Sequence, residues 1–173
     1  MDRRRIGIVG GGPAGLMAAE VLSARGHAVT VLEAMPTIGR KFLLAGKSGL
    51  NITHSEPYDR FAARFGAAGA HLRAALDAFT PGDLRTWAEE LGTETFVGSS
   101  GRVFPVAMKA SPLLRAWRAR LEGRGVDIRV RHRWIGFAPE GLRFETPEGV
   151  AVMAFDAVLL ALGGASWPRL GSD

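Results

Sequence analysis

Residues 5–15 read RIGIVGGGPAG, and this stretch decides the fold of the chain. Its first half is a short apolar run of the kind that forms a buried parallel strand. Its second half places three glycines at the spacing Gly10-x-Gly12-x-x-Gly15. This pattern is weak alone, but after a strand and before a helix it indicates a turn that binds a dinucleotide.

The residues after this turn complete a strand–helix–strand unit. Residues 14–25 place apolar side chains at helical spacing, and Gly26 is expected to end the helix. Residues 28–32 form a second strand rich in β-branched residues, and Glu33 follows it directly. Two strands joined by a crossover helix predict an α/β fold with a parallel sheet.

Each glycine of the turn has its own physical reason. Gly10 allows the tight turn, Gly12 lets backbone N–H groups approach a pyrophosphate, and Gly15 lets the helix pack close to the sheet. The positive end of the helix then faces the phosphates. Glu33 is expected to accept hydrogen bonds from a ribose hydroxyl, and its charge would repel the 2′-phosphate of NADP. The alternative is a glycine-rich turn that binds nothing.

A second glycine motif, Gly46-Lys47-Ser48, matches the end of a P-loop. A P-loop also needs a glycine five positions before Gly46, where this chain has Lys41. The nearest glycine, Gly39, lies two residues too far away, and no buried strand leads into it. We therefore expect this tripeptide to belong to a different kind of loop.

The rest of the chain predicts further helices and strands. Helices are expected over residues 58–65, 70–79, 83–91 and 113–123. Strands are expected over residues 94–97, 102–105, 126–130, 134–137, 142–146, 150–155 and 157–162. The segment Thr80-Pro81-Gly82-Asp83 predicts a capping box, and Ser111 is expected to cap the last helix. The last strand is continuously apolar, so it is expected to be buried on both faces.

This order of elements predicts a three-layer Rossmann-type domain with a helical insertion and an antiparallel β-meander. The domain would comprise residues 1–56 and 126–173, and the mainly helical insertion would comprise residues 57–125. The chain stops just after an expected strand-to-helix turn. We therefore expect it to be the N-terminal part of a longer protein.

Composition excludes several classes of site. The absence of cysteine rules out disulfides, thiolate metal sites and a catalytic thiol within these residues. No apolar run reaches a membrane span and no secretory signal is present, so we expect a cytoplasmic location. The net charge is +5, and 19 of the 22 basic residues are arginine, many of them within residues 115–133. We interpret this cluster as a solvated face, with an anionic partner as the alternative.

Two features favour FAD over NAD as the dinucleotide. The meander precedes a strand that ends in Ala161-Leu162-Gly163-Gly164, as in flavoproteins that bind two dinucleotides. The long loop over residues 34–56 gives FAD room to extend past the first strand–helix–strand unit. Dehydrogenases that bind only NAD usually continue from the second strand directly into another helix.

The chain resembles the N-terminal part of the BaiN/RdsA-type NAD(P)/FAD-dependent oxidoreductases, a family of bacterial flavoproteins. The similarity lies in four stretches that occur here in the same order and spacing: GGGPAGLMAAEVL, GRKFLLAGKSGLNITH, SSGRVFPVAMKASPLLRAW and VLLALGGASWPRLGSD. The resemblance implies a considerably longer FAD enzyme. Its substrate domain and a late segment that returns to the flavin would lie outside these residues.

The resemblance also assigns the Gly46-Lys47-Ser48 loop. The family loop often has the pattern Gly-x-Gly-Arg-Cys-Asn-x-Thr-Asn, and it would lie beside the FAD. This chain keeps Asn51 and Thr53 but has Gly49 and Leu50 at the Arg and Cys positions. This departure suggests that the chain belongs to a distinct subgroup, in which that Arg and Cys have no counterpart at these positions.

The candidate cofactor-binding residues follow from the motif and the resemblance together. They are Gly10, Gly12, Pro13, Ala14, Gly15, Glu33, Ala34, Arg40, Lys41, Asn51, Thr53, Trp134, Leu162 and Gly163. A cation at position 40 or 41 would neutralise phosphate charge. Trp134 begins a strand where such flavoproteins often place a backbone contact to adenine, although its side chain would equally suit a core. Asn51 would equally suit a turn.

The function expected from these residues is that of an FAD-dependent oxidoreductase, in which the flavin carries a hydride or electrons. A pyridine nucleotide is a candidate reductant and a small molecule the expected substrate, but no residue identifies either. No catalytic set and no metal-ligand spacing stands out, and His54 is either a proton donor near the flavin or a solvated loop residue. The alternatives are a tRNA-modifying type of flavoprotein and a redox sensor that binds flavin without turnover.

Overall fold

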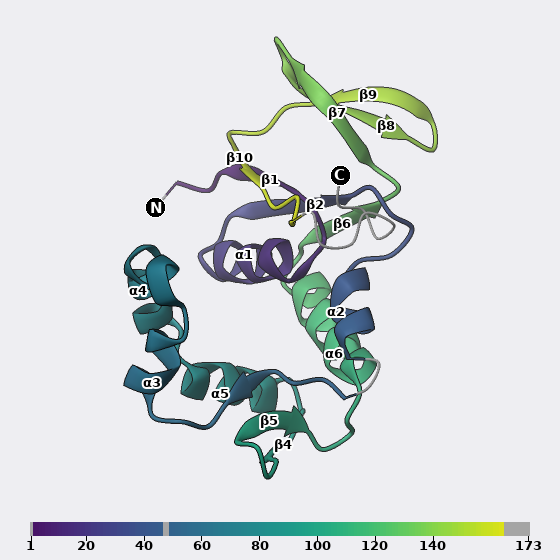
Figure 1. Cartoon of the computed structure of the whole chain (residues 1–173). Coiled ribbons are helices and arrows are strands. Elements are labelled where there is room, and N and C mark those ends of the chain that lie inside the picture. Colours follow the sequence, from purple (N-terminus) through teal and green to yellow (C-terminus); the bar gives the residue numbers. More distant parts are fainter. Residues whose placement is uncertain (1, 47–48, 165–173) are drawn as a thin grey trace. The chain divides into compact units, whose positions relative to one another are not determined.

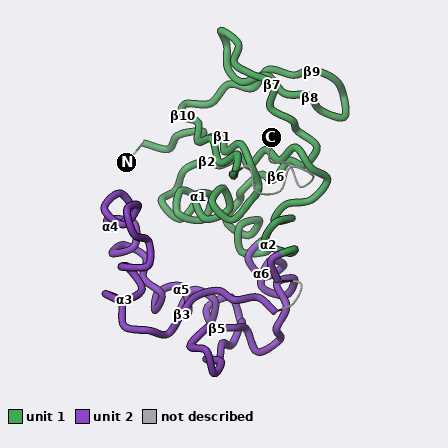
Figure 2. Tube along the Cα trace, in the orientation of Figure 1, with its two compact units in different colours: residues 1–44, 118–173 green, residues 45–117 purple. Residues whose placement is uncertain are grey.

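The computed structural model describes residues 2–46 and 49–164 of the 173-residue chain. The chain forms two compact units (Figure 2), one from residues 1–44 and 118–173 and the other from residues 45–117. We call them unit 1 and unit 2. The predicted domain limits at residues 56 and 126 stay a prediction.

A parallel sheet forms the centre of unit 1. Its strands lie in the order β10-β1-β2-β6 (Figure 1). The strands are β1 (Arg5–Val9), β2 (Ala28–Glu33), β6 (Asp127–Val130) and β10 (Ala157–Leu160). The helix α1 (Pro13–Ala24) connects β1 to β2 and packs against both. The first strand–helix–strand unit predicted from the sequence is therefore confirmed.

The meander forms the third layer of unit 1. It consists of β7 (Arg133–Ala138), β8 (Gly141–Thr146) and β9 (Gly149–Met153), paired in antiparallel order. Leu142 and Phe144 of β8 pack in one buried cluster with Val9 and Leu32 of the sheet.

Successive residues of β1 point alternately to the two faces of the sheet, and a different layer covers each face. Ile8 lies close to Gly15 of α1, whereas a Cβ on Gly7 would meet the ring of Phe155, which packs against the meander cluster. Successive residues of a strand point to opposite faces. The sheet therefore lies between a helix and a meander, which confirms the predicted three-layer architecture.

The predicted arginine cluster is largely paired with acids inside unit 1. Glu20 of α1 is buried and accepts from the Nη1 atoms of Arg120 at 2.9 Å and Arg124 at 3.4 Å. A buried carboxylate needs such partners, because desolvation would otherwise destabilise it. Arg129 pairs with Asp127, and other arginines of the cluster pair in the same way. Arg120 of α6 (Ala110–Gly123) and the following Arg124 therefore fasten this segment to α1, whereas the other pairs of the cluster lie at the surface.

Unit 2 contains short helices and a small antiparallel sheet. The helices are α3 (Tyr58–Ala63), α4 (Gly69–Ala78) and α5 (Pro81–Glu90), with a 3-10 turn over Gly66–Ala68. The sheet has the order β3-β5-β4, formed by Thr53–His54, Arg102–Pro105 and Thr95–Val97. Trp87 and Trp117 meet edge to face with their ring centroids 4.8 Å apart. Asp77 of α4 accepts a hydrogen bond from Tyr58 of α3, which ties the two helices together, and another from Arg73 of its own helix.

Three local expectations were wrong. A short helix, α2 (Arg40–Ala45), lies within the predicted loop of residues 34–56. Helix α6 begins at Ala110, so Ser111 lies inside it and does not cap it. Strand β10 is not buried on both faces: Val158 is 41% exposed and Leu160 is 44% exposed. The reason is that β10 is an edge strand, with no further neighbour among the described residues.

The predicted capping box at the start of α5 is present. The Thr80 hydroxyl and backbone N–H both donate to Asp83 Oδ2, at 2.6 and 2.8 Å, and Asp83 N–H donates back to the hydroxyl at 3.2 Å. The hydroxyl bond, followed by the backbone bond, holds the pKa of the Asp83 carboxyl below its ordinary value. The contact therefore stabilises the folded protein at pH values above the ordinary pKa of an aspartate. This stabilisation is lost as the pH falls through the lowered pKa of Asp83.

We predict that Thr80→Ala lowers the free energy of unfolding of unit 2 by about 1 kcal/mol at neutral pH, because the N-cap is lost. The loss should shrink in acid, where Asp83 is protonated in both proteins. Urea unfolding at several pH values measures both effects. Thr93→Ala removes the same atoms away from the N-cap and should have a smaller effect. Equal losses in the two variants would contradict the capping role.

Candidate functional site

A cavity of about 650 Å³ lies in unit 1. It opens where β1, β2 and β10 end, at Val9, Leu32 and Ala161. The glycine turn and the loop after β2 form further parts of its wall. In open parallel sheets, ligands bind outside the carboxyl ends of the strands. The cavity therefore lies where the glycine motif predicts a dinucleotide.

Two of the three motif glycines are required by close packing. A Cβ on Gly10 would lie 2.3 Å from the carbonyl oxygen of Ala161, and the φ of Gly10 is +109°. A Cβ on Gly15 would lie 1.9 Å from the carbonyl oxygen of Gly10. Side chains cannot be accommodated at such distances, so both positions demand glycine. Gly15 contributes by packing α1 against β1, and it does not line the cavity.

Gly12 is different, because a Cβ there would meet no atom of the described residues within 4 Å. It lines the cavity and is the N-cap residue of α1, without a side-chain cap of its own. Pro13 and Ala14 follow it in the cavity wall. The first N–H groups of a helix have no partner within the helix, so this end of α1 can bind an anion. Packing does not explain the glycine at position 12.

Glu33 has a structural role that the sequence did not predict. Its Oε2 accepts from the backbone N–H of Gly11 and its Oε1 from that of Met35, both at 2.8 Å. The carboxylate thereby joins the glycine turn to the loop after β2, where Ala34 also lines the cavity. Each oxygen keeps further acceptor capacity, so a ribose hydroxyl can still donate to Glu33.

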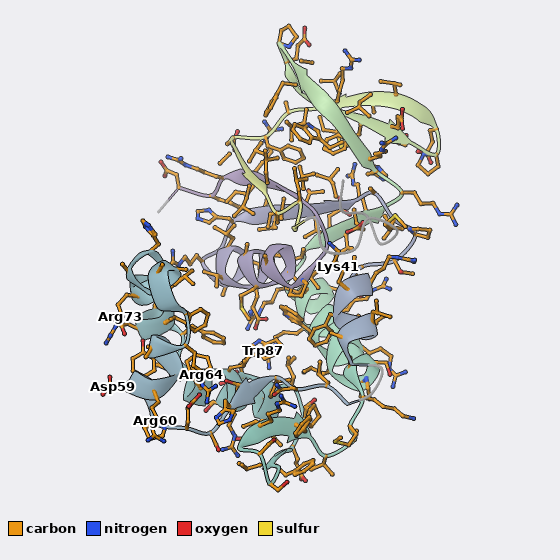
Figure 3. The ribbon with its side chains drawn as sticks, in the orientation of Figure 1. Lys41, Asp59, Arg60, Arg64, Arg73 and Trp87 are labelled. Atoms are coloured by element: carbon orange, nitrogen blue, oxygen red, sulfur yellow. The ribbon has the colours of Figure 1, made fainter. Side chains whose placement is uncertain are left out.

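The two predicted cations, Arg40 and Lys41, both line the cavity. A hydrogen bond from Gly39 N–H to the Gly11 carbonyl, at 2.8 Å, brings their segment to the glycine turn. Lys41 Nζ donates to the carbonyl of Gly164 at 3.1 Å, and its position at the start of α2 is labelled in Figure 3. The Arg40 Nε atom is buried and has no hydrogen-bond partner within the described residues. A buried donor without an acceptor is rare and suggests a ligand group.

The β6–β7 turn and the start of β7 supply another part of the wall. His132, Arg133 and Trp134 line the cavity, and Leu162 and Gly163 line it at the end of β10. The backbone N–H of His132 donates to the Glu33 carbonyl at 2.9 Å, which fixes the turn beside the end of β2.

Sequence reasoning found Trp134 and missed its neighbours His132 and Arg133. Their only signal was closeness in sequence to a strand end. The cavity wall therefore holds three lysine or arginine side chains and one carboxylate, which favours an anionic ligand.

Besides Gly15, two further predicted residues are not part of this cavity. Asn51 and Thr53 lie in unit 2, and neither lines the cavity. Thr53 is buried in β3, where it pairs with Val103, and Asn51 is exposed. Their role beside a cofactor stays a prediction.

His54 follows Thr53 and has a local role. Its Nδ1 accepts from the Glu56 N–H at 3.1 Å, and its Nε2 lies 3.1 Å from the Ser100 carbonyl. Both ring nitrogens are thus engaged within unit 2, which fits a structural histidine better than a free proton donor. The Lys47-Ser48 pair lies outside the described residues.

The chain matches the family model described as the HI0933-like protein Rossmann domain over residues 4–173. The chain belongs to this family. The resemblance to the BaiN/RdsA-type flavoproteins is thereby confirmed. In the part of this HI0933-like chain that the structure describes, no helix is long and apolar enough to cross a membrane. No cluster of three metal-ligating side chains occurs in the same residues.

Known proteins resemble parts of this HI0933-like domain. A multifunctional alkene reductase/demethylase OYE from Caballeronia cordobensis is 60% identical over 42 residues, which are 24% of this chain and 6% of that protein.

Solved structures share the fold at low sequence identity. A 3-ketosteroid-Δ4-(5α)-dehydrogenase from Rhodococcus jostii RHA1 has a TM-score of 0.64 at 14% identity, covering 94% of this chain and 46% of that one. A flavocytochrome c3 fumarate reductase has a TM-score of 0.60 at 17% identity, covering 94% and 34%. The HI0933-like chain thus spans about half or less of the length of these proteins.

We predict that glycine substitutions in the turn separate packing from binding. Gly15→Ala should destabilise unit 1 by roughly 3 kcal/mol or more, because its Cβ cannot avoid the Gly10 carbonyl. Gly12→Ala should change the thermal midpoint little, since its Cβ would meet no atom within 4 Å in the part of the chain that the structure describes. Thermal unfolding followed by circular dichroism measures both. A Gly12→Ala protein as unstable as Gly15→Ala would show that Gly12 also serves packing.

Proposed function

We propose that this chain forms the FAD-binding part of an FAD-dependent oxidoreductase. The observation that carries the proposal is the open space at Gly12, between two glycines that packing requires. A glycine without a packing reason, at a helix N-terminus in a cavity wall, is expected where backbone N–H groups approach a pyrophosphate. The family membership supports the same conclusion.

The residues of the cavity suit FAD. The glycine turn and α1 would hold the pyrophosphate, with Arg40 and Lys41 near enough in the wall to balance its charge. Arg40 carries a buried Nε donor that has no acceptor in the described parts of the chain, and a phosphate oxygen would provide one. Glu33 would accept from the ribose, and its charge disfavours the extra phosphate of NADP.

FAD is favoured over NAD by the third layer of unit 1. After β6 the chain enters the meander and returns in β10, as expected for a flavoprotein and not for a dehydrogenase that binds NAD alone. The similarity to an alkene reductase/demethylase, although it covers only 42 residues, points to redox chemistry as well.

FAD, when bound, supplies the hydride or electron transfer. The residues of this chain bind and orient it. The glycine turn fixes the pyrophosphate, and Glu33 fixes the turn through its bond to Gly11. Lys41 holds the end of β10 through Gly164, which keeps that wall of the cavity in place. A small-molecule substrate, reduction by NADH or NADPH and a cytoplasmic location complete the proposal and rest on sequence alone.

No observation favours the alternative of a tRNA-modifying flavoprotein. The arginines that suggested it are mostly engaged with acids, as in the Arg118–Glu122 and Arg129–Asp127 pairs. A redox sensor that binds flavin without turnover would need the same cavity as an enzyme, so the cavity does not distinguish these two functions. Reduction of the bound flavin by NADH or NADPH, followed by reoxidation by a candidate acceptor, separates the two.

We predict that the intact protein, purified in its native form, has the absorbance spectrum of a flavin and releases FAD on denaturation. Gly12→Val should lose at least nine-tenths of the bound FAD while remaining folded, because its side chain would occupy the pyrophosphate position. Absorbance and chromatography of the extract measure the occupancy. Wild-type protein that binds no adenine dinucleotide, even when it is supplied, would refute the proposal.

A second prediction concerns charge. Arg40→Met should weaken FAD binding by roughly tenfold to a hundredfold, the usual effect of losing a hydrogen bond to a charged group. Affinity is measured by titrating the apoprotein with FAD at two salt concentrations. Arg143→Met removes the same charge from β8, away from the cavity, and should leave the affinity within about twofold. Similar losses in both variants would argue for a general effect of net charge.

A further inference from the structure

Lys41 lies against the end of β10 in the wall of the cavity. Its Nζ donates to the carbonyl of Gly164 at 3.1 Å, and a Cβ built on Gly163 would lie 3.3 Å from the same Nζ atom. The φ of Gly163 is +80°, a left-handed conformation that favours glycine. Lys41 and Gly163 both line the cavity. The backbone of residues 163 and 164 therefore positions a positive charge at this part of the wall.

The strand order places this charge relative to the rest of the wall. Strands β10, β1 and β2 are neighbours in this order and run parallel, so their carboxyl ends lie at the same edge of the sheet. Glu33 ends β2, the glycine turn follows β1, and Gly163 and Gly164 follow β10. The ends of β2 and β10 therefore lie on opposite sides of the glycine turn, since neighbouring strands are about 4.8 Å apart. Lys41 belongs to the β10 side.

The position of Lys41 bears on one half of the dinucleotide, and this step rests on the proposed function. In that proposal the glycine turn holds the pyrophosphate, and Glu33 holds the ribose of the adenosine half. The pyrophosphate joins this half to the half that carries the flavin. With the adenosine half on the β2 side of the turn, the flavin half would extend toward the end of β10, where the Lys41 ammonium lies.

We propose that Lys41 raises the reduction potential of the bound flavin. Reduction of FAD to its anionic reduced form takes up two electrons and one proton, so the ring system gains one negative charge. An ammonium group on the flavin side of the turn attracts this charge and stabilises reduced FAD more than oxidised FAD. Because its hydrogen bond to Gly164 already positions the ammonium, little reorganisation is needed when the charge appears.

Arg40 should have a different effect, although it is the neighbouring residue. Its buried Nε atom is proposed to donate to a phosphate oxygen. The pyrophosphate carries the same charge in oxidised and reduced FAD, so a cation that contacts it binds both forms equally. Arg40 should therefore govern the affinity for any ligand with a pyrophosphate. Lys41 should instead govern the ratio of the affinities for reduced and oxidised FAD.

The test compares the two variants in the intact protein. Lys41→Met should lower the affinity for reduced FAD relative to oxidised FAD by roughly tenfold, which lowers the two-electron potential by about 30 mV. It should weaken the binding of ADP, which has the pyrophosphate but no flavin, less than Arg40→Met does. Arg40→Met should weaken ADP and FAD alike and keep the ratio within about twofold of wild type. The potential is measured by reducing the flavin anaerobically with dithionite beside a dye of known potential.

Two further variants test whether the charge at this position is responsible. Lys41→Arg keeps the charge and should stay near the wild-type potential. Lys109→Met removes a lysine that does not line the cavity and should leave the potential unchanged. For a variant that releases FAD, titrating the apoprotein with oxidised FAD and, anaerobically, with reduced FAD gives the same ratio. A Lys41→Met protein with the wild-type ratio would overturn the inference. Wild-type protein that binds neither ADP nor FAD would instead overturn the proposed function.

Discussion

The contact between the first turn of α1 and the end of β1 is the constraint on which unit 1 depends. A Cβ on Gly15 would lie 1.9 Å from the Gly10 carbonyl oxygen, so only glycine permits the helix to come this close. This approach directs the N-terminus of α1 into the cavity at the ends of the strands. The same contact therefore serves packing and places the anion-binding end of the helix.

Glu33 shows how one carboxylate can serve fold and function together. It fastens the glycine turn through the Gly11 N–H and the following loop through the Met35 N–H. If Glu33 also binds the ribose as proposed, the residue that holds the sugar would fasten the phosphate loop as well, and the site would be pre-organised because the two parts cannot move independently. Glu33 is therefore needed for the shape of the glycine turn, whether or not it also binds a sugar as proposed.

The polar side chains of unit 1 have different surroundings away from the cavity and at the cavity. Away from the cavity, arginines pair with acids, as Arg120 and Arg124 do with the buried Glu20. At the cavity, Arg40 and Trp134 keep buried donors without an acceptor among the residues described. Unsatisfied donors are tolerated where a ligand supplies the missing acceptors. The chemistry of this domain therefore concentrates at the carboxyl ends of the strands.

The sequence by itself determined β1, α1, β2, the capping box at Thr80 and the fold class, because these follow from short-range periodicity and from turn and capping residues. It also supplied most of the cavity residues, those of the turn from the glycine motif and the others from the motif together with the family resemblance. Only the tertiary structure decided that β10 lies at a sheet edge, that Gly12 but not Gly15 faces the cavity, and that His132 joins the wall. These features depend on contacts between segments far apart in the chain, and no local pattern of residues encodes such contacts.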